Sequence, residues 1–369
     1  MVSSSTTTTS SNSNTSVTNN KKTVLVFGST GAVGTCLIEM LSTKQPTWTI
    51  LAVSRKLGTS KFAHLSNVQV VQGDALQPED VLNLTSSQNV NVDIVYSCIG
   101  FPNYERKYWS NHWPIVVDNL LEGVSQQPNT KLVFCDNLYA YGATTNISST
   151  TRKTSNAIVK PSFKSKPGVR ATLWEKFEQH IECKGNTNPI VVVGGADFFG
   201  PNVTDTAFLG DTFTKVILSG EKAPIAIGSS SVVHDFCYVP DFANALYVAS
   251  TRNEANNKFW ICPHTIHNKT MSEIANDVAR LSKGAKSPGI KVQTFPGWSV
   301  KMLSPFVGFL REMVEMLPYW SKDYSVVEDK QNEFCTTFNV KSTPYEHALQ
   351  SYIDFYKETL KQEEGQKQK

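Results

Sequence analysis

The sequence predicts an α/β fold in which a doubly wound parallel sheet is covered by helices on both faces. Short and almost continuously apolar runs, rich in β-branched residues, alternate with segments whose apolar residues recur at helical spacing. A glycine-rich turn joins the first of these runs, Thr23 to Phe27, to the first helical segment. Both observations predict strand, turn and helix units repeated along one parallel sheet.

The expected elements follow one another from residue 23 onward. After the first strand, four apolar residues share one face of a helix expected over residues 32–42: Val33, Leu37, Ile38 and Leu41. Runs of strand type follow at residues 49–54, 68–71, 94–99, 132–135 and 190–193. Helical periodicity is found at residues 113–124, 172–182, 272–281, 302–320 and 344–360.

The regular alternation loosens near residue 200, and this change suggests a division into parts. Residues 1–21 are dominated by Ser, Thr and Asn, which predicts a disordered polar tail. We expect a nucleotide-binding domain over residues 22–200. Residues 201–369 are expected to form a mixed α/β lobe on the substrate side, interleaved with that domain.

Composition argues against several classes of protein. Hydrophobic residues make up 40% and charged residues 18%, and 35 basic residues nearly balance 32 acidic ones. We therefore predict no nucleic-acid partner, and no membrane partner because no window approaches the roughly 18 apolar residues of a span. The seven cysteines show no CxxC or Cys/His ligand spacing, so we expect reduced thiols, no metal site and a cytoplasmic protein.

The turn after the first strand has the spacing of a phosphate-binding loop. Glycine at its first two positions permits a tight turn and a close approach of backbone to a pyrophosphate, and the third lets the helix pack on the strand. The N-terminus of the helix offers unpaired N–H groups. We predict a Rossmann-type dinucleotide site at all seven residues of this loop: Gly28, Ser29, Thr30, Gly31, Ala32, Val33 and Gly34.

The end of the second strand favours one form of the dinucleotide. Folds that prefer NAD usually carry an acidic residue there, which holds the ribose 2′-hydroxyl. This chain has Ser54, Arg55 and Lys56 instead. A guanidinium suits a 2′-phosphate, so we predict NADP(H), and NAD(H) less so, with Ser54 and Arg55 as contacts. The alternative is that both cations only face solvent.

Residues after the third and fourth strands complete the predicted cofactor site. Asp74 could accept a hydrogen bond from the adenine amino group, and helix capping is the alternative role for its carboxylate. The next residue, Ala75, is also predicted to contact the cofactor. Cys98 and Gly100, at the end of the fourth strand, are predicted cofactor contacts as well.

Four further segments complete a family resemblance. They read Asp136-Asn-Leu-Tyr-Ala-Tyr-Gly142, Ala196-Asp-Phe-Phe-Gly-Pro201, His234-Asp-Phe-Cys-Tyr-Val-Pro-Asp241 and Ser342-Thr-Pro344. With the glycine loop and Asp74, they resemble the extended branch of the short-chain dehydrogenase/reductase superfamily, which holds NAD-dependent epimerases and dehydratases. The resemblance covers about residues 22 to 360. It implies the Rossmann fold, a nicotinamide cofactor and a homodimer, which is common in the family.

The chain departs from the catalytic pattern of that family. Members typically use a Ser, a Tyr and a Lys, the last two in a YxxxK motif, in which the lysine lowers the pKa of the catalytic tyrosine. Here Asp136 and Asn137 stand near the serine position, and residues 161–166 (PSFKSK) contain no tyrosine. A second register puts Lys166 at the tyrosine position and Arg170 at the lysine position. Neither register restores the motif.

Another phenol could take over proton transfer. Tyr139 and Tyr141 follow the fifth strand, at the end of the sheet where open α/β folds bind ligands. Tyr141 matches a family position that is usually structural, so we favour Tyr139 as the catalytic group. Lys166 or Arg170 would lower its pKa, and Asn137 would orient a carbonyl or a water. The alternative is that both tyrosines only pack and hydrogen-bond.

Two features of the sequence bear on the nature of the substrate. His234 stands where the family often has an arginine that contacts a sugar-nucleotide phosphate, which argues against a nucleotide sugar. Five aromatic residues could wall an apolar pocket or pack in the core: Phe101, Tyr104, Tyr108, Trp109 and Trp113. We therefore predict an NADP(H)-dependent oxidoreductase or epimerase-like enzyme for a small carbonyl or hydroxyl compound. The alternative is a non-catalytic NADP(H)-binding sensor or interaction protein that has lost the YxxxK motif.

Overall fold

The computed structural model describes most of the chain in segments. These are residues 21–58, 60–86, 91–145, 147, 159–183, 185, 187–204, 207–220, 222–284, 289–326 and 333–367. Of the predicted polar tail, Lys21 alone belongs to them, and the rest of that prediction lies outside the described residues.

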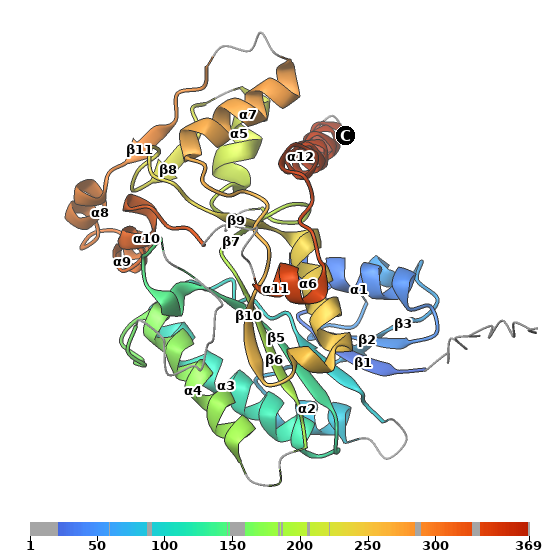
Figure 1. Cartoon of the computed structure of the whole chain (residues 1–369). Coiled ribbons are helices and arrows are strands. Elements are labelled where there is room, and N and C mark those ends of the chain that lie inside the picture. The colour runs from blue at the N-terminus through green and yellow to red at the C-terminus, as the bar shows by residue number, and fades with distance from the viewer. Residues whose placement is uncertain are drawn as a thin grey trace, which may run out of the picture.

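A parallel sheet forms the centre of the molecule (Figure 1). Within the described residues it has seven strands in the order β10-β6-β5-β4-β1-β2-β3. Their bounds are β1 Thr23–Phe27, β2 Thr49–Ser54, β3 Val68–Gln72, β4 Ile94–Ser97, β5 Lys131–Asn137, β6 Ile190–Gly195 and β10 Lys258–Ile261. The direction of strand order reverses between β1 and β4, which is where doubly wound sheets bind nucleotides. The predicted fold class is confirmed.

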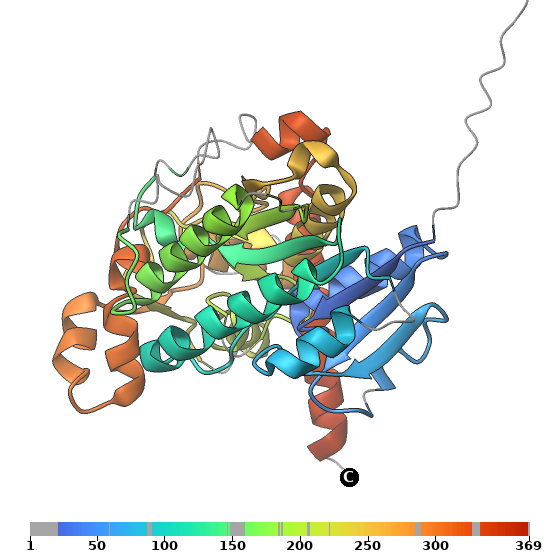
Figure 2. The same cartoon turned by 90° about the horizontal axis from the view of Figure 1, so that it is seen from below.

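Helices cover both faces of this sheet because its strands are apolar on both sides (Figure 2). Helices α1 Ala32–Lys44 and α6 Val239–Thr251 contact each other on one face. On the other face lie α2 Pro78–Thr85, α3 Arg106–Ser125 and α4 Lys166–Glu182. In β1, Val24 and Val26 join the core beneath α1 and α6, whereas Leu25 and Phe27 join the core beneath α3 and α4.

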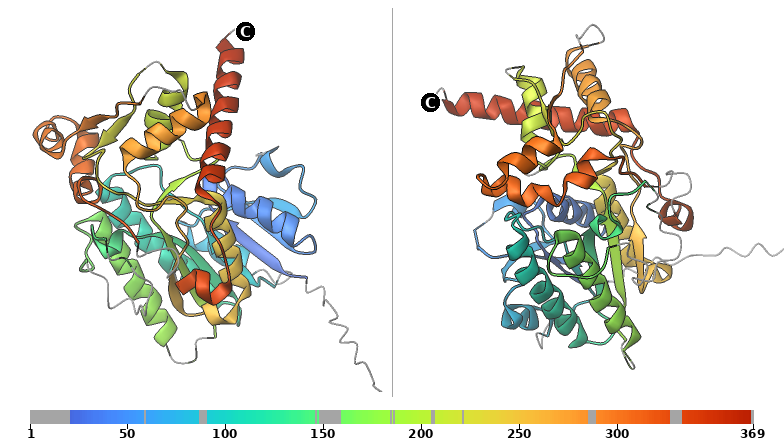
Figure 3. Two further views of the ribbon diagram at one scale, coloured as in Figure 1. Left: turned by 45° about the horizontal axis from the view of Figure 1, so that its top comes forward. Right: turned by 90° about the vertical axis from the view of Figure 1, so that its left-hand side faces the viewer.

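A lobe formed largely by residues beyond 200 has its own apolar core. Side chains of α5, α7 and α12 meet there, among them Ile217, Ile274 and Tyr352, and all are buried. Its elements are β7 Asp197–Phe199, η4 Gly210–Lys215, α5 Val216–Ser219, β8 Ile225–Ile227, β9 Phe236–Tyr238, α7 Met271–Lys283, β11 Gln293–Phe295 and α12 Tyr345–Lys367. Figure 3 shows α12 running along the outside of this lobe. The predicted domain boundary at residue 200 stays a prediction. Two elements that come after it, α6 and β10, belong to the layers of the central sheet.

Residues 302–320 do not form the single helix that their periodicity predicts. They are distributed over α8 Gly297–Leu303, α9 Gly308–Val314 and α10 Leu317–Ser321. Pro305 falls between the first two helices, where its ring and missing N–H prevent the helical hydrogen bonds from continuing. Short helical or 3-10 turns complete the described elements: η1 Ser60–Phe62, η2 Tyr139–Tyr141, η5 Asn253–Ala255 and α11 Glu333–Phe338. No helix in the described part of the chain is both long and apolar enough to cross a membrane.

Candidate functional site

The glycine loop between β1 and α1 has the geometry of a phosphate cradle. Gly28 has a φ of +74°, and a Cβ there would lie 2.4 Å from the carbonyl oxygen of Cys98. A Cβ at Gly34 would lie 2.2 Å from the carbonyl oxygen of Gly28. The Gly31 N–H donates to the Gly28 carbonyl at 3.1 Å, and α1 begins at the next residue. The loop therefore closes tightly beneath the free N–H groups of a helix N-terminus and fits a pyrophosphate.

Gly34→Ala is expected to weaken nicotinamide dinucleotide binding by at least about tenfold, or roughly 1.4 kcal/mol. The added methyl group would meet backbone atoms of Gly28, so the loop would have to open. Titration calorimetry with NADPH measures the effect. Gly365→Ala is the control, because a Cβ there meets nothing within 4 Å. Unchanged affinity in Gly34→Ala would show that the loop does not hold the cofactor.

Some side chains near the loop make structural contacts, and others are exposed to solvent. The buried Ser29 hydroxyl donates to the Val53 carbonyl at 2.7 Å, so it ties the loop to β2. The Ser54 hydroxyl donates to the Lys56 carbonyl at 2.9 Å. Thr30 and Arg55 are exposed. Arg55 is thus accessible to a ligand phosphate beside the loop, and its role stays a prediction.

The predicted contacts after β3 and β4 lie at the same end of the sheet. Asp74 Oδ1 accepts from the Leu76 N–H at 3.0 Å, so this carboxylate closes the turn before α2. Ala75 is buried, and its carbonyl accepts from Asn119 at 2.9 Å. Cys98 is buried beside Gly28, and burial raises the pKa of its thiol. Gly100 is exposed.

Lys166, at the position of the family tyrosine in one register, is a buried tether to the lobe. It is the first residue of α4 and has no exposed surface. Its Nζ lies 2.6 Å from Glu315 Oε1 and 3.1 Å from Glu312 Oε2, and also donates to the Glu312 carbonyl at 2.9 Å. These contacts tie α4 to α9. The charge of Lys166 is therefore already neutralised.

Arg170, one helical turn later, is committed to a second buried ion pair. Its Nη1 lies 3.0 Å from Asp136 Oδ1, and its guanidinium carbon lies 3.8 Å from the ring centre of Trp113. Trp174 Nε1 donates to the other oxygen of Asp136 at 2.6 Å. Burial raises the pKa of the Asp136 carboxyl, and Arg170 opposes that rise. The two residues that the second register puts at the YxxxK positions are thus held by carboxylates.

Tyr139 belongs to a chain of three polar side chains. Its hydroxyl donates to Asp197 Oδ1 at 3.1 Å, and His234 Nε2 lies 2.7 Å from Asp197 Oδ2. The predicted lowering of the pKa of Tyr139 is wrong: burial and the charge of Asp197 raise it well above the ordinary value. Asn137 Oδ1 accepts from the Tyr139 N–H at 3.1 Å, so its amide shapes η2.

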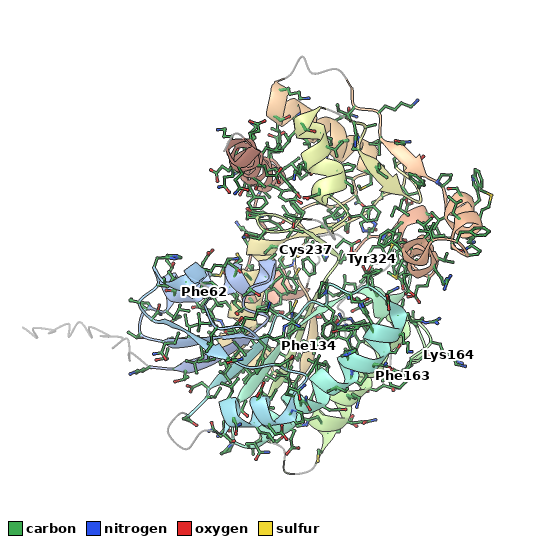
Figure 4. The ribbon with its side chains drawn as sticks, turned by 180° about the vertical axis from the view of Figure 1, so that it is seen from behind. Phe62, Phe134, Phe163, Lys164, Cys237 and Tyr324 are labelled. Carbon is green, nitrogen blue, oxygen red and sulfur yellow. The ribbon has the colours of Figure 1, made fainter. Side chains whose placement is uncertain are left out.

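The Tyr139–Asp197–His234 chain borders a cavity of about 1100 Å³. The sheet contributes residues that follow β4, β5 and β6, and the lobe contributes mostly apolar side chains such as Phe208, Val300 and Phe309. His234 stacks on Phe208, and its ring also lies 5.2 Å from that of Tyr324, which Figure 4 shows between lobe and sheet. Such a concave, mainly apolar space at the carboxyl ends of parallel strands suits a substrate.

The predicted aromatic wall is divided between cavity and core. Tyr104 lines the cavity, and its hydroxyl and that of Tyr139 influence each other's pKa. Trp109 and Trp113 instead cover Arg170. These two indoles therefore belong to the packing of α3 on α4.

Sequence reasoning missed Asp197 as a functional candidate and gave His234 no chemical role. Asp197 lies two residues past the end of β6, at the carboxyl end of a parallel strand, and that position was a usable signal. His234 lies 37 residues further along the chain, and no local pattern indicates its pairing with Asp197. Within the described residues, no group of three or more His, Cys, Asp or Glu side chains could hold a metal ion.

Comparison with known proteins places this site in a family context. The model of the NAD dependent epimerase/dehydratase family matches residues 24–262. A search of curated protein sequences found no match.

Among solved structures, dTDP-glucose 4,6-dehydratase from Bacillus anthracis in complex with NAD is similar in fold, with a TM-score of 0.69 at 16% identity over 91% of this chain and 97% of that one. UDP-glucose 4-epimerase from Thermotoga maritima with UDP-glucose has a TM-score of 0.69 at 18% identity, over 92% of this chain and 99% of that one. UDP-glucuronic acid 4-epimerase from Bacillus cereus in complex with NAD has a TM-score of 0.67 at 17% identity, over 92% and 98%.

Proposed function

Because the chain belongs to the NAD-dependent epimerase/dehydratase family, we propose that it is an NADP(H)-dependent oxidoreductase for a carbonyl or hydroxyl compound. One observation carries the proposal: a phenol, a carboxylate and an imidazole form a continuous chain, and the phenol and the carboxylate border the cavity. A binding cavity alone would not need this chain. It supplies the proton path that carbonyl reduction or alcohol oxidation requires.

The glycine loop, Arg55 and the ends of β3 and β4 would hold the cofactor. When bound, a nicotinamide dinucleotide supplies or accepts the hydride. Arg55 and Lys56 stand where an acidic residue would otherwise select NAD, so the residues favour NADP(H).

Arg55→Ala is expected to weaken NADPH binding by about 1 to 3 kcal/mol, because a charge-assisted contact to the 2′-phosphate is lost. NADH binding should change little, since NADH lacks that phosphate. Parallel calorimetric titrations of the unaltered protein and of Arg55→Ala with NADPH, NADP, NADH and NAD measure this difference. Equal losses for NADPH and NADH would contradict the NADP(H) assignment.

The proton path follows from the hydrogen bonds at Tyr139. In the direction of alcohol oxidation, the phenol takes the proton of the substrate hydroxyl while its own proton passes to Asp197 Oδ1. His234, hydrogen-bonded to the other carboxylate oxygen, holds Asp197 in position for this transfer. In the direction of reduction, the same path runs backwards and protonates the substrate oxygen.

The cavity favours a substrate without phosphate groups. Three carboxylates line it, Glu105, Asp197 and Glu312, of which Glu312 is paired with Lys166, and the guanidinium in the lining is that of Arg311. An anionic diphosphate would meet repulsion there, whereas an uncharged and mainly apolar molecule would match the lining.

Transfer of deuterium from stereospecifically labelled NADPH to a panel of apolar aldehydes and ketones tests the proposed function. We expect label in the alcohol product and from one face of the nicotinamide only. If NADPH binds but no compound of the panel acquires label and none is consumed, the oxidoreductase proposal fails.

The second candidate is a sensor of NADP(H) without turnover. The specific observation in its favour is that Lys166 and Arg170, which one register puts at the YxxxK positions, are buried in ion pairs. Such a protein would distinguish NADP from NADPH by affinity. Calorimetry that finds a large difference between these two ligands, together with the absence of label transfer, would favour the sensor.

A further inference from the structure

The segment from Phe295 to Arg311, here called the hairpin surface, exposes large apolar side chains. It includes the helices α8 and α9, which project from the lobe in both Figure 1 and Figure 2. The most exposed side chains are those of Trp298 (68%), Met302 (59%), Phe306 (87%) and Phe309 (61%). Aromatic and aliphatic groups clustered on one short hairpin are unusual on the surface of a monomeric protein and mark a contact site.

The hairpin surface is nevertheless firmly attached at its base. Val300 and Met313 are buried in the core that lies beneath α3 and α4. Glu312, which directly follows Arg311, contacts Lys166 and accepts from the Arg106 N–H at 2.6 Å. The exposed apolar side chains thus belong to an anchored element and lie on its outer side.

The hairpin surface itself carries cations, and the first acid after it, Glu312, pairs with the buried Lys166. Residues 289–311 contain Lys291, Lys301 and Arg311 and no acidic residue, and all three cations are exposed. Apolar aromatic groups flanked by cations are the pattern that binds the interface of an anionic bilayer, where the rings enter the headgroup region and the cations meet lipid phosphates. Phe309 and Val300 of the same hairpin also line the wall of the cavity, so a bilayer bound to the hairpin surface would lie next to the cavity.

We propose that the hairpin surface docks the protein on an anionic lipid bilayer. The contact is peripheral and does not depend on whether the chain is an enzyme. It differs from the expectation from sequence that there is no membrane partner. A second copy of the chain fits less well. Self-association of this surface across a two-fold axis would bring its cations near their own copies, with no acidic residue in the segment to pair them.

Sedimentation of the full chain with phospholipid vesicles tests the proposal. We expect strong binding to vesicles of mixed phosphatidylserine and phosphatidylcholine, and weak binding to phosphatidylcholine alone. The double variant Trp298→Asp/Phe306→Asp should bind the anionic vesicles at least about tenfold more weakly. Lys301→Glu should weaken binding about fivefold or more, since each cation near an anionic surface contributes an effect of about this size.

Ile115→Asp is the matched control, because it places the same acid at an exposed apolar residue of α3. It should bind vesicles like the unaltered chain, and NADPH affinity in every variant checks folding. Failure of the folded, unaltered chain to bind anionic vesicles would overturn the proposal. So would equal binding by the double variant, or a concentration-dependent dimer that the double variant abolishes in the absence of vesicle binding.

Discussion

Tyr139→Phe is expected to lower kcat for label transfer by about 10² to 10⁴, the usual contribution of a positioned acid or base. The substitution removes the hydroxyl that links the cavity to Asp197 and leaves the ring in its contact with Tyr319. NADPH affinity should stay within about twofold, because no charged contact to the cofactor is lost. Steady-state kinetics with a reactive compound of the carbonyl panel measures the change.

Tyr141→Phe is the matched control for this experiment. Tyr141 is also a buried phenol of η2, but the described residues that line the cavity do not include it. Its loss should lower kcat far less than the loss of Tyr139. A second arm uses Asp197→Asn, which keeps the shape of the side chain and removes the group that takes the proton. If Tyr139→Phe turned over at the unaltered rate, the proton path would lie elsewhere and Tyr139 would be a packing residue.

The fold could be predicted from the sequence because its signals are local. The strands Thr23–Phe27 and Thr49–Ser54 have the predicted bounds, since each is a short apolar run ended by a turn. The glycine loop could likewise be predicted from the spacing of its glycines alone. Helix α3 begins at Arg106, well before the predicted residue 113, because its first turns lack a clear apolar period.

The candidate site was harder to predict because its contacts join distant segments. Lys166 and Glu312 are separated by 146 residues, and Tyr139 and Asp197 by 58. A sequence pattern can place each residue at the end of a strand or helix, but pairing depends on the tertiary fold. Lys166 therefore looked like a cation able to act on Tyr139, whereas the lobe supplies the carboxylates that occupy it.

The hairpin surface escaped the sequence reading for a different reason. The net charge of +3 is an average over 369 residues and conceals a segment of 23 residues without acids, 289–311. Periodicity also assigned residues 302–320 to one amphipathic helix, which would have buried its apolar face. The break at Pro305 instead leaves Phe306 exposed.

Arg170→Met is expected to lower the free energy of unfolding by about 3 to 5 kcal/mol, the range for removing one partner of a buried ion pair. The substitution leaves the carboxylate of Asp136 buried beside Trp174 without a cation. Urea unfolding at neutral pH measures the loss. Arg280→Met is the control, because Arg280 forms its ion pairs at the surface, where solvent screens them, and its loss should change stability little.

The charge of Asp136 makes this loss depend on pH. Burial already raises the pKa of Asp136, and removing Arg170 takes away the main opposing effect, so the pKa of this carboxyl rises further. A carboxyl whose pKa is higher in the folded protein than in the unfolded chain favours folding at acid pH, and this contribution is lost as pH rises through the folded value. The stability of Arg170→Met should therefore be closest to that of the unaltered protein in acid and furthest from it near neutrality.

Adding Asp136→Asn to Arg170→Met removes the charge while keeping an acceptor for Trp174, so it should restore most of the stability and abolish the pH dependence. A double variant no more stable than Arg170→Met would mean that lost packing, and not an unpaired charge, causes the effect.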